Sequence, residues 1–338
     1  MAKRVGTATL LLENTPSVEA FGAIGSKREA EGPLGGFFDQ LCSDSTMGEQ
    51  TWEKAECRLQ KDAINVALKK AGLSPPDLQY IFAGDLLNQC TSSTYGLRDL
   101  GVPFVGLYGA CSTMAESLSL ASLFIEGGFG EHTAAITSSH FCAAERQFRF
   151  PLEYGGQRTP TSQWTVTGAG AAIVGKASAP PYVRAVTIGA IKDMGITDAN
   201  NMGAAMAPAA ADTIGRFFQD TGMAPDRFDM IATGDLGMVG SALLLELLER
   251  DGWKLQGRHV DCGLLIYDRE KQQVEAGGSG CGCSAAVLCA YILPAIRRGD
   301  LSNVLFIATG ALMSTTSVQQ GESIPGIAHL LWLSSSPK

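Results

Sequence analysis

The stretch Asp62–Leu86 reads DAINVALKKAGLSPPDLQYIFAGDL, and 150 residues later Asp212–Leu236 reads DTIGRFFQDTGMAPDRFDMIATGDL. The two stretches align without a gap, and both contain a central glycine, Gly72 or Gly222, and end in Gly-Asp-Leu. In each, an amphipathic helix is followed by a glycine C-cap, a turn containing proline and an apolar strand. The repeat predicts that the chain consists of two related α/β units.

A second repeat has a spacing of 171 residues and places Cys111–Ser139 on Gly282–Gly310. Few residues are identical, but both segments contain a turn, a helix of small and apolar residues, a glycine and an apolar strand. Such helices are typical of positions buried between sheets, and such strands are typical of sheets covered on both faces. Two unrelated helix–strand units of similar composition are the alternative. The shared order favours duplication into halves 1–178 and 179–338, divided near the Lys-Ala-Ser-Ala-Pro-Pro segment.

Composition restricts the possible functions. The chain has 338 residues, is 45% hydrophobic and has a net charge of −8, so it can bury a large core, and its acidity argues against binding to nucleic acid. No run of about 18 apolar residues is present, and the first residues do not resemble a secretory signal. We therefore expect a soluble protein inside the cell.

The nine cysteines are odd in number, and many lie in apolar segments. This pattern is typical of reduced thiols in a core rather than of a disulfide framework. Cys281 and Cys283 have no second Cys or His pair at ligand spacing, so no metal site is predicted.

Cys111 is the most reactive candidate. The run Phe104-Val-Gly-Leu-Tyr-Gly-Ala-Cys leads from a strand directly into a helix and places Cys111 at the helix N-terminus. Backbone N–H groups and the helix dipole there can stabilise a thiolate, a carboxylate or an oxyanion. A small core residue in a tight turn is the structural alternative.

Together, the strand–Cys–helix turn and the duplication resemble the thiolase superfamily, over the whole chain. The resemblance implies an α/β fold of two pseudo-symmetric doubly wound halves in α/β/α/β/α layers. Its condensing members use a His, and some also an Asn, from the second half. Here the segment Ile231–Met238 contains no histidine, and Gly282 stands where the Asn would be. We expect no condensing activity, with a residual acyl-transferase or thioesterase that uses Cys111 as the alternative.

The four histidines do not supply an obvious catalytic partner. His132 and His259 are expected in solvated polar turns, and His329 lies in the last apolar strand, where a core role is expected. His140 follows an apolar strand at its carboxyl end, where ligands bind in open α/β sheets. It is the only histidine expected to line a pocket.

Several segments also resemble the stage V sporulation protein AD family. They include LYGACSTM, AERQFRFPLEYGGQ, AMAPAAADTI, DCGLLIYD and AGGSGCGCSAA, and they are spread between Gly32 and His329. The resemblance implies binding of dipicolinic acid, or its calcium chelate, during uptake into the developing spore and release at germination. It implies no cofactor. The implied partners are membrane subunits of the same channel system, so the protein would lie at the spore inner membrane through these partners. Thiolase-like proteins commonly form homodimers, by our expectation through the strand after the Cys111 helix.

Dipicolinate is a flat pyridine with two carboxylates, so its pocket needs donors or positive charge and an apolar wall. Arg146 and Arg149 are candidates for the carboxylates, with Phe148 or Phe150 against the ring. The alternative is a solvated loop with a structural salt bridge to Glu145 or Glu153. Asp85 and Asp235 end equivalent strands, where they either face the ligand, hold calcium or cap turns. The predicted ligand site comprises seven residues: Asp85, Cys111, Ser138, His140, Arg146, Arg149 and Asp235.

Overall fold

The computed structural model describes residues 2–148, 158–176, 178–255 and 257–337. The predicted repeat is visible in its local structure. Helices α2 (Trp52–Ala71) and α6 (Met202–Thr221) both end at a left-handed glycine, with φ of 69° at Gly72 and 68° at Gly222. A short 3-10 turn containing proline follows each of them, and then a strand, β5 (Tyr80–Gly84) or β11 (Met230–Thr233).

Each half of the chain contributes one series of elements. The first series is β3 (Ser17–Gly25), α2, β5, α3 (Thr91–Leu97), β6 (Phe104–Gly106), α4 (Thr113–Glu126), β7 (His132–Ser139), α5 (Phe141–Phe148) and β9 (Gly168–Gly175). The second is β10 (Tyr182–Thr187), α6, β11, α7 (Gly237–Arg250), β12 (His259–Asp261), α10 (Cys281–Val287), η8 (Leu288–Ile292), α11 (Leu293–Arg298), β14 (Asn303–Ala311), α12 (Thr315–Gln319) and β15 (Gly326–Ser334).

Short elements complete the chain. They are β1 (Lys3–Val5), β2 (Thr9–Leu11), α1 (Lys27–Ala30), β4 (Gln40–Leu41), β8 (Trp164–Thr165), α8 (Cys262–Ile266), α9 (Arg269–Gln272) and β13 (Gly278–Ser279).

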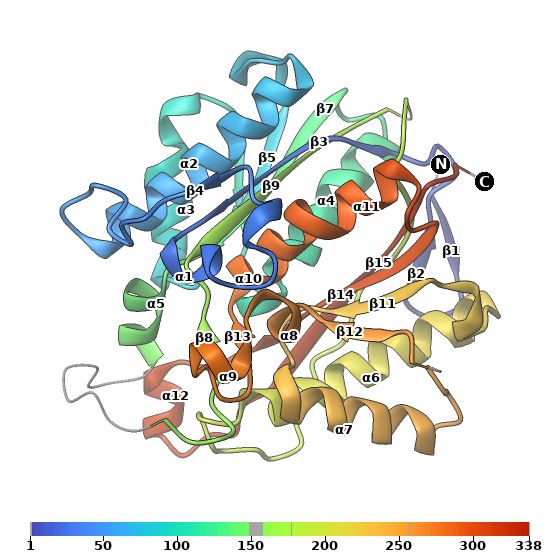
Figure 1. Ribbon diagram of the computed structural model, residues 1–338. Coiled ribbons are helices and arrows are strands. Elements are labelled where there is room, and N and C mark those ends of the chain that lie inside the picture. Colours follow the sequence, from blue (N-terminus) through green and yellow to red (C-terminus); the bar gives the residue numbers. More distant parts are fainter. Residues whose placement is uncertain (1, 149–157, 177, 256, 338) are drawn as a thin grey trace.

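Equivalent strands of the two halves follow one another in the same order when the sheet is read inward from either edge. The path runs β12-β11-β14-β15-β10-β3-β9-β7-β5-β6 (Figure 1). In each half the two outermost pairs are parallel, and the other pairs are antiparallel. Along this path the halves are joined between β10 and β3 by the single residue pair Tyr182 and Ser17. Strands β2 and β8 of the first half also pair with β10 and β13 of the second. A duplicated chain would give this arrangement, while the boundary between residues 178 and 179 stays a prediction.

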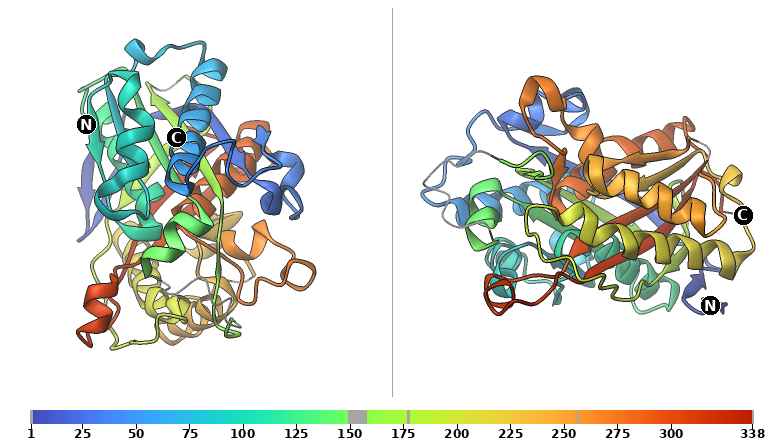
Figure 2. Two further views of the ribbon diagram at one scale, coloured as in Figure 1. Left: turned by 90° about the vertical axis from the view of Figure 1, so that its left-hand side faces the viewer. Right: turned by 90° about the horizontal axis from the view of Figure 1, so that it is seen from below.

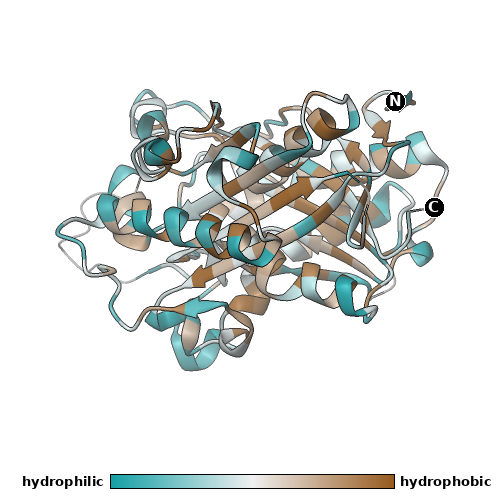
Figure 3. Cartoon of the chain, turned by 90° about the horizontal axis from the view of Figure 1, so that it is seen from above, coloured by the Kyte–Doolittle hydropathy of each residue, from teal (hydrophilic) through white to brown (hydrophobic). Residues whose placement is uncertain are grey.

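Three apolar cores separate the layers. One lies between α2 and the outer face of the first sheet, and another lies between α6 and the outer face of the second. Helices α6 and α7 run side by side over that face (Figure 2), and the outer helices turn their hydrophilic residues away from the apolar strands (Figure 3). The central core contains α4 and the α10–α11 run between the sheets. The layers are therefore α/β/α/β/α, as the sequence predicts.

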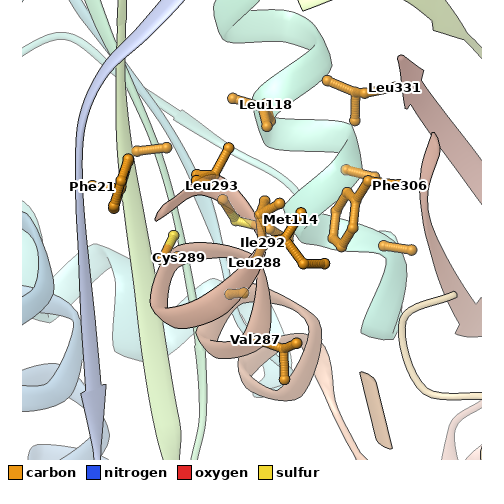
Figure 4. Packing of buried hydrophobic residues seen from close by; sticks show 14 of the residues in the cluster. Phe21, Met114, Leu118, Val287, Leu288, Cys289, Ile292, Leu293, Phe306 and Leu331 are labelled. Carbon is orange, nitrogen blue, oxygen red and sulfur yellow. The ribbon is translucent and has the colours of Figure 1, made fainter. Parts of the chain in front are cut away.

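The central helices consist mainly of small and apolar residues. Met114 of α4 lies beside Leu288 and Ile292 of the η8 turn, with Phe306 of β14 next to it (Figure 4). By length and composition the run Cys281–Arg298 could cross a membrane, but 78% of it is buried within the protein. Among the described residues it is the one helix with this property. Its apolar character is explained by its position between two sheets.

The expectation that a dimer forms through the strand after the Cys111 helix is not compatible with this topology. That strand is β7, which is hydrogen-bonded to β9 on one side and to β5 on the other. Its backbone groups are therefore already paired along its length. The strand at the free edge of the first half is β6, which precedes Cys111.

Candidate functional site

Cys111 lies in the turn that leads from β6 into α4. It is the middle residue of the 3-10 turn η5 (Ala110–Ser112), and the preceding Ala110 has a φ of 51°. This left-handed conformation is unfavourable for a residue with a Cβ and is typical of turns that hold a functional group. The N–H of Ser112 donates to the Gly109 carbonyl oxygen at 3.0 Å. The strained turn thus presents Cys111 at the start of α4, as the sequence predicts.

The second half contains an equivalent turn 171 residues later. There the N–H of Cys283 donates to the Gly280 carbonyl oxygen at 2.9 Å, the same bond as in the first turn. Gly282 then occupies the position that corresponds to Cys111. A Cβ on Gly282 would lie 2.4 Å from the Gly168 carbonyl oxygen, so no side chain fits at this position. One turn therefore carries a thiol and the other carries only backbone.

The carboxylate of Asp235 lies beside the Cys111 thiol. It accepts hydrogen bonds from the Gly280 N–H at 2.8 Å, the Ser279 hydroxyl at 3.2 Å and the Thr309 hydroxyl at 3.0 Å. Burial raises the pKa of Asp235 to about 7. Burial, followed by the negative charge of Asp235, raises the pKa of the Cys111 thiol well above its usual range.

These effects correct the expectation that the helix N-terminus stabilises a Cys111 thiolate. The favourable helix dipole is a small term compared with the cost of burying a charge next to a carboxylate. At neutral pH the thiol is protonated, and its nucleophilicity is correspondingly low.

Asp85 ends the equivalent strand of the first half but has a different role. Its carboxylate accepts from the Ser93 N–H and hydroxyl, at 2.7 and 2.6 Å, and from the Leu87 N–H at 2.9 Å, so it caps the segment that leads into α3. In the second half Asp261 performs the capping, because it accepts from the N–H groups of Leu236 and Gly237 at 2.8 and 3.0 Å. Asp235 is thereby left to face Cys111.

Two adjoining cavities lie in front of Cys111. The inner one, of about 30 Å³, is bordered by Cys111, Ser279 and Met202, and holds about one water molecule. The outer one, of about 310 Å³, has room for a small organic molecule. Four side chains line both cavities and form the neck between them: Leu86, Tyr108, Phe148 and Met313. The outer cavity also has polar side chains, from Asn88, Gln89, Gln147, Ser314, Thr315 and Thr316.

Of the predicted site residues that the structure describes, Cys111 lines this cavity pair, and five do not: Asp85, Ser138, His140, Arg146 and Asp235. The Ser138 hydroxyl is buried, donates to the Glu56 carboxyl at 2.9 Å and accepts from Gln60 at 2.9 Å. The ring of His140 is also buried, and its Nε2 donates to the Ser45 carbonyl oxygen at 2.8 Å. Burial lowers the pKa of His140. Both side chains support the ends of the first sheet.

Arg146 does not reach the cavity pair either. Its guanidinium pairs with Glu53 and lies 5.6 Å from the Trp52 ring centroid, so it ties α5 to the start of α2. Its side chain is 46% exposed, which matches the alternative of a structural ion pair, although with a different acid. Arg149 and Phe150 lie outside the described residues, whereas Phe148 lines both cavities.

No hydrogen bond or ion pair in the described structure links any of the four histidines to Cys111. His132 and His259 are not solvated turn residues, because each is the first residue of a strand. His132 pairs with Glu19 at 2.8 Å, and His259 bonds to Thr233 at 2.9 Å. His329 is buried, as expected for a core residue, and accepts from the Gly189 N–H at 3.3 Å.

Comparisons with known proteins identify the family of this chain and support the fold described above. The family described as stage V sporulation protein AD (SpoVAD) matches residues 6–334. The chain belongs to this family. Stage V sporulation protein AD of Bacillus subtilis (strain 168) is 46% identical over 327 residues, which cover 97% of this chain and 96% of that protein. Family membership makes the chain a sporulation protein of the developing spore.

Solved structures show the same fold at low sequence identity. A single-residue variant of OleA from Xanthomonas campestris has a TM-score of 0.61 and 13% identity, and the match covers 96% of this chain and 99% of that chain. The 3-oxoacyl-[acyl-carrier-protein] synthase III from Aquifex aeolicus VF5 has a TM-score of 0.57 and 14% identity, with 94% and 99% covered. The chain therefore has the thiolase-like fold of these proteins.

We expect Asp235→Asn to change how stability depends on pH. The native pKa of Asp235 is about 7, against 3.8 for an ordinary aspartate, so the native state holds this proton more tightly than the unfolded chain. The resulting stabilisation is complete below about pH 4 and is lost as the pH rises towards about 7. Because asparagine does not titrate, urea unfolding of the variant should show a shallower loss of stability across this range, by up to about 1.4 kcal/mol per pH unit.

The control for this measurement is Asp251→Asn, at an aspartate whose side chain is 55% exposed. Its stability curve should run parallel to that of the wild type. A parallel curve for Asp235→Asn as well would mean that Asp235 does not hold the proton inferred from its burial.

Proposed function

We propose that the chain binds dipicolinate, or its calcium chelate, in the cavity pair in front of Cys111, and that it does not catalyse a reaction. The observation that carries this proposal is the cavity itself, whose outer part of about 310 Å³ combines aromatic walls with amide and hydroxyl groups. Tyr108 and Phe148 suit the faces of a pyridine ring. Asn88, Ser314 and Thr316 are of types that donate to carboxylate oxygens.

The size of the cavities decides how we place the ligand. The inner cavity, of about 30 Å³, is too small for a ring, so we place the ring in the outer cavity. One carboxylate then points through the neck towards the N–H groups at the start of α4.

Charge bears on the calcium question. Burial raises the pKa of three acids near the Cys111 turn, Asp85, Glu116 and Asp235. A raised pKa reduces the negative charge that an anionic ligand meets. In the described parts of the chain no three His, Cys, Asp or Glu side chains are grouped as metal ligands. We therefore propose that any calcium enters already coordinated by dipicolinate.

Three observations support a binding role over catalysis. Gly282 has no space for a side chain where condensing relatives are expected to carry Asn. No described histidine contact reaches Cys111. The raised pKa keeps the Cys111 thiol protonated. A residual acyl-transferase or thioesterase is favoured only by the position of Cys111 at the strained turn.

We expect Cys111→Trp to abolish dipicolinate binding, because the indole would fill the inner cavity and displace the side chains of the neck. Cys111→Ser should reduce affinity less than about tenfold, since no thiol chemistry is required. Isothermal titration calorimetry with dipicolinate, with and without calcium, measures both. Cys42→Trp is the control for a bulky substitution elsewhere. Unchanged affinity in a folded Cys111→Trp protein would place the ligand at another site.

We expect no turnover of acyl-CoA. After incubation with acetyl-CoA, mass spectrometry should find no acyl group on Cys111, and coenzyme A release should match that of Cys111→Ser. The reason is that the thiol is protonated and that no histidine of the described residues contacts it. An acyl adduct on Cys111 that a second substrate removes would instead establish the enzymatic alternative.

We further propose that the protein associates with the spore inner membrane through membrane subunits of the same channel system, and that it forms a homodimer along β6. This strand ends the sheet, and Phe104 and Val105 are 39% and 38% exposed. An exposed apolar edge strand tends to pair with another chain unless another element covers it. Antiparallel pairing of two β6 strands around a two-fold axis would provide one from a second copy.

Val105→Lys should therefore convert the protein from dimer to monomer, because two lysines would face each other across the two-fold axis. Light scattering after size-exclusion chromatography measures the mass. Leu245→Lys, on the outer helix α7 where Leu245 is 42% exposed, is the control and should stay dimeric. A monomeric wild-type protein, or a dimeric Val105→Lys protein, would contradict the proposed interface.

A further inference from the structure

Two arginine side chains, Arg184 and Arg227, pack against the ring of Trp332 on β15. The guanidinium carbon of Arg184, on β10, lies 4.7 Å from the ring centroid of Trp332, and that of Arg227, in the turn before β11, lies 5.4 Å from it. Trp332 is only 2% exposed, and its indole N–H donates to the Asn303 side chain at 2.9 Å. The ring is therefore a fixed platform against which two cations pack, and their guanidinium carbons lie at most about 10 Å apart.

These two cations have no counter-charge in the described structure. Some partly buried arginines are paired with acids, as Arg158 is with Glu145 and Arg216 with Asp212, whereas Arg28 and Arg258 donate to backbone carbonyl oxygens. No carboxylate of a described residue forms an ion pair with Arg184 or Arg227. Two neighbouring guanidinium groups without an anion repel each other.

Arg184 has unused hydrogen-bonding capacity. It is half-buried, and its Nη1 donates to the Ser336 carbonyl oxygen at a long 3.3 Å, while its Nε is buried without a partner among the described residues. Burial, and then the positive charge of Arg227, lower the pKa of Arg184. Arg227 is exposed, so the pair is open to solvent on one side.

We propose that Arg184 and Arg227 form a binding site for a phosphate group. A phosphate carries up to two negative charges and several acceptor oxygens, so one group can receive N–H bonds from both guanidinium planes and offset both charges. The shared chemistry is found in free inorganic phosphate and in the headgroup of an anionic phospholipid.

The proposed site is separate from the Cys111 cavities. Trp332 pairs with Leu305 on β14, whereas Thr309, which bonds to Asp235, lies four residues further along the same strand. That spacing corresponds to roughly 13 Å along a strand. The phosphate site therefore does not depend on the dipicolinate proposal.

The test uses the full chain with inorganic phosphate at constant ionic strength. Titration calorimetry should show phosphate binding to the wild type, and Arg227→Gln should weaken it at least about tenfold, the loss expected for one charge-assisted contact. Because Arg227 is exposed, this variant keeps the fold even if Arg184→Gln does not. Arg250→Gln, at an arginine with 72% side-chain exposure on α7, removes the same charge and should bind like the wild type.

A second experiment distinguishes a phospholipid headgroup from free phosphate as the ligand. Flotation with vesicles of phosphatidylglycerol and phosphatidylcholine, against phosphatidylcholine alone, should show Arg227-dependent binding if a lipid headgroup is the ligand. Phosphate binding without flotation supports a free anion. Equal binding of phosphate and vesicles by the wild type and Arg227→Gln, or binding of neither, overturns the proposal.

Discussion

The arrangement of this protein depends on backbone contacts between the two halves at the ends of their strands. A Cβ on Gly310, at the end of β14, would lie 2.2 Å from the Gly109 carbonyl oxygen in the Cys111 turn. In the reverse direction, Gly282 in the second turn lies against Gly168 of β9. Each turn is therefore pressed against a strand of the other half, at a distance that only glycine permits. The site in front of Cys111 exists because these contacts bring both halves together.

Within this symmetric frame, one change of hydrogen-bond partner makes the two halves different. Asp85 and Asp235 end equivalent strands, but Asp261 takes over in the second half the capping that Asp85 performs in the first. Asp235 is then available to bond to Gly280 and to face Cys111. Burial, and after it this diverged carboxylate, raise the pKa of the Cys111 thiol and keep it protonated, although its position at a helix N-terminus would favour ionisation.

The sequence was sufficient to predict the duplication and the position of Cys111, because these depend on local patterns: helix, glycine cap, proline turn and apolar strand. The layers followed from the resemblance to the thiolase superfamily. It was not sufficient for the pocket lining. Met202 and Met313 converge from distant elements and carry no local signal, whereas Tyr108 stands only three residues before Cys111, and that proximity was a usable signal. Arg146 was misplaced because its partner Glu53 lies 93 residues away. Nothing in the sequence around either residue indicates that pairing.

The neck between the two cavities has a consequence for the kinetics of binding. Leu86, Tyr108, Phe148 and Met313 border both cavities, so any group that reaches the Cys111 turn must move between flexible and aromatic side chains. Entry and exit then require correlated rotamer changes, which slow association and dissociation by a common factor without altering the equilibrium constant. A ligand carrier with such a passage would retain its cargo for a residence time that is set by the side chains at the neck rather than by affinity alone.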